Sequence, residues 1–173
     1  MIKKIILLSI VLSTTNLIAQ EENKLELSVG GNFLLPISDG WDNDYFIGGS
    51  AGLGFIISPK VIIGGSIEYN TYIPEHNSPE NVTSLLGINA NIKRVFPAQN
   101  SSSSFYLQLE VGFFVPITED QFYSIFPELC GSVGVEFLLS KNTFLFIDVG
   151  YMLGIAENFP KLFSTNAGVN FRI

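Results

Sequence analysis

Residues 47–57 read IGGSAGLGFII, in which Ile47, Leu53 and Phe55 alternate with small residues such as Gly48 and Ser50. A period of two residues is typical of a strand whose two faces meet different surroundings. The same period recurs in seven further segments: 25–35, 61–72, 82–93, 105–115, 129–139, 143–153 and 163–173. Each segment is about as long as a tilted membrane strand, which needs roughly 9–11 residues. After its first 19 residues, the chain shows no apolar stripe of helical period, so we expect an all-β protein of eight strands.

The lengths of the connections between these segments predict the topology. Residues 58–60 and 140–142 form short connections, and residues 96–104 form a somewhat longer one. The other four connections are mostly longer and carry acids and aromatics; they are residues 36–45, 73–81, 116–127 and 155–162. Short turns on one side and longer loops on the other are typical of outer-membrane barrels. We therefore expect an eight-stranded antiparallel up-and-down transmembrane β-barrel, with both termini on the periplasmic, short-turn side.

Composition narrows the class of protein. The chain has 173 residues, of which 47% are hydrophobic and 14% charged, and its formal net charge is −7. Average globular chains carry roughly 25% charged residues. The apolar content argues against disorder, and the acidic balance argues against a nucleic-acid partner. The single cysteine, Cys130, excludes an internal disulfide.

The residue types on the polar face favour a barrel lumen over a water-exposed surface. They are mostly glycine, serine, asparagine and glutamine, whereas a soluble surface is usually rich in lysine and glutamate. All charges of the predicted strands fall on this face: Glu26, Glu68, Lys93, Glu110, Glu136, Asp148 and Arg172. A charge facing lipid at the bilayer midplane costs about 2–4 kcal/mol, which explains the bias. A soluble barrel shares the alternation and stays open as an alternative.

The N-terminus has the features of a secretory signal. Lys3 and Lys4 precede an apolar stretch, residues 5–12, and a small residue, Ala19, follows a polar stretch. The apolar stretch is shorter than the ~20 residues of a membrane helix. We therefore expect a signal peptide over residues 1–19 and a barrel domain over residues 20–173.

Aromatic residues gather near both ends of the predicted strands. Tyr45, Phe46 and Tyr69 lie near the long loops, and Phe96 and Phe105 lie near the short turns. This distribution predicts the two aromatic girdles of a membrane barrel.

The whole mature chain resembles the small eight-stranded outer-membrane proteins of the OmpA transmembrane-domain and OmpX type. The most specific element is the last strand, residues 163–173, which reads FSTNAGVNFRI and has Phe171 third from the end. Family members end in an aromatic at or near the terminus, which the barrel-assembly machinery reads. The resemblance implies an outer-membrane location in a diderm bacterium and a structural or surface-contact role. It implies no shared enzymatic activity.

Charges on the lumen face form the first candidate site. Glu26 and Arg172 lie near the same rim on the first and last strands, which must pair to close the barrel, so we predict a contact between them. Lys93, Glu110, Glu136 and Asp148 occupy the lower and middle lumen and are expected to join a charge network. The interior of an eight-stranded barrel is just filled by side chains, which favours a structural plug. An ion-conducting gate is the functional alternative.

The first long loop contains an acidic cluster, Asp39, Asp42 and Asp44. Clustered oxygens suit calcium, but the spacing does not match an EF-hand, and we expect a solvated loop without metal. His76, the only histidine, lies in a predicted loop without a serine nucleophile at a recognisable spacing. We predict no enzyme activity and no cofactor, and we interpret Cys130 as a small lumen filler.

These observations predict a monomeric membrane protein whose partners are the lipid bilayer and, through residues 163–173, the assembly machinery. A structural or surface-interaction role with a plugged lumen is the first hypothesis. A narrow conduit for small solutes and a secreted, soluble ligand-binding barrel are the alternatives.

Overall fold

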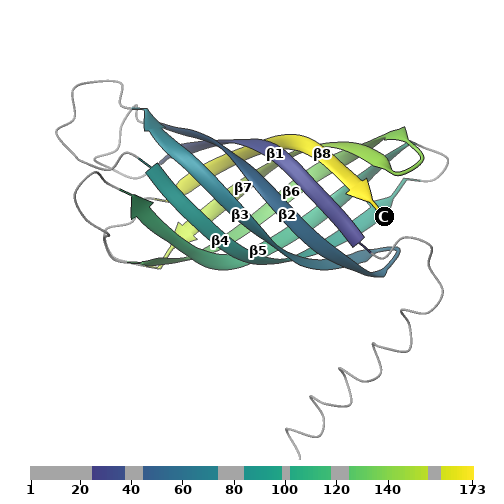
Figure 1. The fold of residues 1–173 in the computed structure, drawn as a ribbon, viewed down its shortest axis with the longest axis horizontal. Coiled ribbons are helices and arrows are strands. Elements are labelled where there is room, and N and C mark those ends of the chain that lie inside the picture. The colour runs from purple at the N-terminus through teal and green to yellow at the C-terminus, as the bar shows by residue number, and fades with distance from the viewer. Residues whose placement is uncertain (1–24, 38–44, 74–83, 99–101, 118–124, 156–160) are drawn as a thin grey trace, which may run out of the picture.

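The computed structural model describes residues 25–37, 45–73, 84–98, 102–117, 125–155 and 161–173. These residues form one closed antiparallel β-barrel (Figure 1). Its strands are β1 (Leu25–Pro36), β2 (Tyr45–Ser58), β3 (Val61–Ile73), β4 (Ser84–Pro97), β5 (Ser103–Ile117), β6 (Phe126–Ser140), β7 (Thr143–Gly154) and β8 (Leu162–Arg172).

Each strand pairs with its neighbours in the sequence, and β1 pairs with β8 to close the barrel. Glu26 lies opposite Arg172 at one end of this seam, and Pro36 lies opposite Leu162 at the other. Two residues separate β2 from β3 and β6 from β7, so the tight turns lie at the end of the barrel that holds Leu25 and Ile173. The predicted fold, an eight-stranded up-and-down barrel, is confirmed.

Seven of the eight strands are longer than the sequence pattern indicated. β4 extends to Pro97 instead of residue 93, and β6 begins at Phe126 instead of residue 129. Pro127 was assigned to a loop, yet proline is accepted near the first residue of a strand, where its missing N–H costs little. The extension of β6 brings Glu128 into the barrel, where it is 3% exposed.

Apolar side chains cover the outward face of the barrel. Val29, Ile67 and Val111 lie in different strands and are 58%, 57% and 57% exposed. The strand interiors alternate between such exposed residues and buried ones over most of their length. Within the described segments, no helix is long and apolar enough to cross a membrane. A surface of this kind buries its apolar area only in a lipid phase or in an assembly.

One strand charge was missed by the sequence pattern, and one expectation about the faces was wrong. Arg94 lies beyond the predicted end of its strand and is exposed on the outward face, with its guanidinium carbon 5.4 Å from the centre of the Phe96 ring. It lies near the short turns, where a long side chain reaches the membrane interface. Phe46 was assigned to an aromatic girdle, but it is 1% exposed and packs inside the barrel.

Three inward-pointing rings lie against glycines of the neighbouring strand. Phe114 is opposite Gly87, Tyr106 is opposite Gly134, and Phe146 is opposite Gly168. A Cβ atom at Gly87 would be 2.7 Å from Cε1 of Phe114, closer than atoms can pack. The small residues of the lumen face therefore make room for large residues, as a narrow barrel requires.

Alanine in place of Gly87 tests this packing. We expect Gly87→Ala to destabilise the barrel by about 1–3 kcal/mol, because the added methyl group forces the Phe114 ring out of its position. Gly131→Ala is the matched control, since a Cβ atom there meets no heavy atom within 4 Å. Urea titration of the two refolded variants measures the difference. Equal stability of the two variants would show that the ring has room to move.

Candidate functional site

Four charged side chains meet inside the barrel at its short-turn end. They are Glu26 of β1, Lys93 of β4, Glu136 of β6 and Arg172 of β8, and we call them the ion-pair ring. Lys93 contacts Glu26 through its Nζ atom and lies 2.8 Å from Oε1 of Glu136. Arg172 lies 2.8 Å from Oε2 of Glu26 through Nε and 2.6 Å from Oε2 of Glu136 through Nη2. Each acid thus pairs with both bases, and the four formal charges cancel.

Three members of the ring are buried and Arg172 is partly buried, so the pairing matters for stability. The side chain of Glu136 is 0% exposed, and those of Glu26 and Lys93 are 6% exposed. Asn170 also donates from Nδ2 to Oε1 of Glu136, at 2.8 Å. A buried charge that keeps all its partners is tolerated, whereas one that loses a partner is strongly destabilising. The ring therefore connects β1, β4, β6 and β8 across the lumen and stabilises their arrangement.

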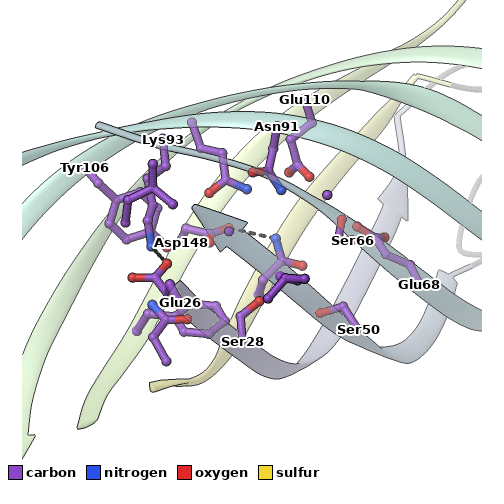
Figure 2. A pocket seen from close by; sticks show the side chains of 18 of the residues that line it. Glu26, Ser28, Ser50, Ser66, Glu68, Asn91, Lys93, Tyr106, Glu110 and Asp148 are labelled. Atoms are coloured by element: carbon purple, nitrogen blue, oxygen red, sulfur yellow. Dashed lines mark hydrogen bonds and ion pairs between the residues drawn. The ribbon is translucent and has the colours of Figure 1, made fainter. Parts of the chain in front are cut away.

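A polar cavity of about 70 Å³ lies next to the ring, in the middle of the barrel. Figure 2 shows Glu26 and Lys93 on one side of it and Glu68 and Glu110 on the other, with Asp148 between them. Asp148 accepts hydrogen bonds from the Tyr106 hydroxyl at 2.6 Å and from Nδ2 of Asn166 at 2.7 Å. Serine, asparagine and glutamine side chains also line the cavity, together with apolar residues such as Ile62 and Phe146.

Glu68 is held by two amides. Asn89 donates to its Oε1 atom at 3.2 Å, and Asn32 donates to its Oε2 atom at 3.4 Å. These two amide donors fix the direction of the carboxyl group.

Apolar side chains fill the lumen beyond the cavity, toward the long loops. This apolar cluster consists of Leu34, Phe46, Leu85, Phe114, Cys130, Met152 and Leu162, all at most 4% exposed. A smaller cluster, Ile62, Val95, Tyr106 and Phe146, lies toward the short turns. The lumen is therefore partly apolar, whereas the sequence pattern predicted mostly glycine, serine and amide side chains on this face. Cys130 is buried and free, in keeping with its assignment as a filler.

The structure brings together some of the residues singled out in the sequence. The Glu26–Arg172 contact predicted across the seam is present, and Lys93 and Glu136 join it. Glu110 and Asp148 line the cavity and form no ion pair among the described residues. Asp39, Asp42 and Asp44, as well as His76, lie outside the described residues. In the described part of the chain, no three His, Cys, Asp or Glu side chains are placed to hold a metal ion.

Three residues of the lumen were missed as members of the site. Glu68 was assigned to the lumen face but not to the charge network, and Tyr106 was not singled out. Glu128 was left out of the strand that was expected to begin at residue 129. Its signal was available, because it lies two residues before Cys130 and so shares the parity of the lumen face.

Comparison with known proteins gives the fold a context. No protein-family model and no curated protein sequence matches the chain. Solved structures do resemble it. Neisserial surface protein A (NspA) has a TM-score of 0.67 and 15% identity, over 86% of this chain and 97% of that one.

Two further structures are similar. The N-terminal β-barrel domain of Pseudomonas aeruginosa OprF has a TM-score of 0.59 and 14% identity, over 89% of this chain and 100% of that one. Ail, the attachment invasion locus protein of Yersinia pestis, has a TM-score of 0.55 and 18% identity, over 88% of this chain and 100% of that one. The TM-scores show that these proteins share the fold of this chain. The low sequence identities show no common activity. In its fold, the chain is a small eight-stranded β-barrel of the kind found in these outer-membrane proteins.

Proposed function

We propose that this chain is an integral outer-membrane protein with a structural or surface-contact role and a closed lumen. The observation that carries the proposal is that side chains fill the lumen at two levels along the barrel axis. The apolar cluster fills the lumen toward the long loops, and the ion-pair ring crosses it toward the short turns. The exposed apolar outward face supports the membrane location, since lipid is the medium that such a face requires.

The surface-contact part of the proposal is supported by the fold that the chain shares with Ail, described as an attachment invasion locus protein. The topology supports an orientation of the barrel in the membrane. The short turns lie on the periplasmic side and the long connections face outward, as in outer-membrane barrels. We propose no catalytic role.

Export and assembly belong to the same proposal. Residues 1–19 act as a signal peptide that is cleaved after Ala19, and residues 20–173 form the mature barrel. The C-terminal strand, residues 163–173, is the segment presented to the assembly machinery, and the barrel stays monomeric in the bilayer. N-terminal sequencing of the exported protein tests the cleavage site.

Planar-bilayer recording tests the closed lumen. We expect the refolded wild-type protein to carry negligible current, because the apolar cluster and the ion-pair ring fill the lumen on either side of the cavity. A large porin in the same bilayers is the positive control. Reproducible unitary currents from the wild-type chain would contradict the closed lumen and favour a narrow solute conduit.

Cell fractionation separates the membrane proposal from a soluble barrel. We expect the protein to be recovered with the outer membranes and to show heat-modifiable migration on gels. Recovery in the soluble periplasmic fraction would favour the secreted ligand-binding barrel.

A further inference from the structure

The exposed charged side chains at the short-turn end of the barrel are all basic. Among the described residues of this end they are Lys60, Arg94 and Lys141. The two acids of the ion-pair ring lie at the same end, but they are buried in the lumen. In the sequence, the connections 58–60 and 140–142 each contain a lysine and no acid. The short-turn rim therefore presents positive charge to its surroundings.

Arg94 is the one charged side chain that faces outward in the described strands. It lies between Val61 of β3 and Leu107 of β5, its partners in the strand register. Both neighbours are apolar, and Leu107 is 53% exposed on the lipid-facing band. The ion pairs among the described residues use Lys93 and Arg172 and do not include Arg94. Its guanidinium therefore has no anionic partner within the described part of the barrel.

The Phe96 ring holds the Arg94 guanidinium near the end of the barrel. The two side chains share the outward face, because they lie two residues apart in β4. The guanidinium carbon lies 5.4 Å from the centre of the ring, within the range of a cation–π contact. Phe96 is next to the last residue of β4, so this contact directs the charge toward the rim, where lipid headgroups lie. Stacking uses the face of the guanidinium and leaves its N–H donors available for an anion.

Lys60 places a second cation beside Arg94. Its carbonyl oxygen accepts a hydrogen bond from the backbone N of Val95 at 2.8 Å, and Val61, the next residue, pairs with Arg94. The backbones of the two basic residues are therefore adjacent. Lys60 is exposed in the turn between β2 and β3, and its ammonium lies on a flexible four-carbon stem. One anionic group at the rim is thus within reach of both cations.

We propose that Arg94 and Lys60 bind the phosphate of an anionic phospholipid in the periplasmic leaflet. The inference rests on the membrane location and orientation proposed above. Arginine binds phosphate through two parallel N–H donors, and a basic side chain close to an anionic lipid surface favours association with it. The acyl chains continue along the lipid-facing band beside Ile63 and Ile92, which pair in the next outward row and are 47% and 45% exposed. A zwitterionic lipid fits less well, because its own cationic group is repelled by the two basic side chains.

Quenching by brominated lipids tests this preference next to the site. The reporter is Leu107→Trp in a Trp41→Phe background, since Trp41 is the only tryptophan and position 107 pairs with Arg94. The protein is refolded into vesicles of phosphatidylcholine with one fifth phosphatidylglycerol. Either the phosphatidylglycerol or an equal amount of the phosphatidylcholine carries bromine on its acyl chains, so the composition stays fixed. We expect phosphatidylglycerol to associate about fivefold more strongly than phosphatidylcholine at this position, the effect of about one basic side chain near an anionic headgroup.

The double variant Arg94→Gln, Lys60→Gln is expected to reduce this preference below about twofold. Both side chains are exposed, so the substitutions leave the packing of the lumen unchanged, and heat-modifiable migration checks that the variant has folded. Lys141→Gln is the matched control. Lys141 is exposed in the turn between β6 and β7 at the same rim, so its loss removes one charge without touching the site, and the preference should remain.

The outcomes separate this site from the membrane location on which it rests. Equal quenching by the two brominated lipids, or a preference that survives in the double variant, would overturn the site and leave the membrane location supported. Quenching by neither lipid would overturn the membrane location and the site together.

Discussion

Glu136→Gln is expected to destabilise the folded barrel by about 3–5 kcal/mol, the usual cost of removing one partner from a buried ion pair. Glu136 is 0% exposed at its side chain and pairs with both Lys93 and Arg172. Its neutralisation leaves the buried Lys93 and the partly buried Arg172 with one acid between them. Urea titration of the variant refolded in lipid vesicles measures the loss.

Glu128→Gln is the matched control for this prediction. Glu128 lies in the same strand and is 3% exposed, yet neither of its carboxylate oxygens has a hydrogen-bond partner. Replacing an unpaired buried carboxyl group by an amide is expected to leave stability unchanged or to raise it. If both variants lost the same stability, pairing within the ring would not be what holds these strands together.

Val111→Arg is expected to lower the free energy of unfolding by about 2–4 kcal/mol, because the new guanidinium lies near the middle of the lipid-facing band. Phe105→Arg is the control. Val111 and Phe105 lie on the outward face of β5, and both are 57% exposed. They differ in depth, since Phe105 is near the short-turn end, where a charge costs only about 0–1 kcal/mol. Folding titrations in vesicles compare the two. A water-exposed barrel would accept both arginines equally, which would contradict the membrane location.

The strand pattern and its parity were enough to predict the barrel and its seam. Alternation assigns each residue to a face, and closure places the first strand beside the last, so the Glu26–Arg172 contact followed without further information. The partners of Arg172 across the lumen did not follow. Glu136 reaches it from β6, and that contact depends on strand tilt and side-chain length, neither of which alternation encodes.

The alternation also did not predict the side chains that lie near the two ends of the barrel. Phe46 and Phe114 share the lumen parity, but aromatics are common in strands for reasons of packing, so their type did not reveal a closed lumen. Glu128 was lost because Pro127 resembles a loop residue when its strand neighbours are not known. Arg94 escaped notice because the strand continues past the last alternating residue that the sequence made evident.

Quenching of a tryptophan by brominated lipid tests the central claim, that the outward face of the barrel lies in a bilayer. The variant Val111→Trp is made in a Trp41→Phe background, refolded into vesicles whose acyl chains carry bromine near the bilayer centre. Lys141→Trp, in the exposed turn between β6 and β7, is the control in the same background. The account predicts strong quenching at position 111 and weak quenching at position 141. Equal quenching at the two positions, or none at position 111, would contradict it.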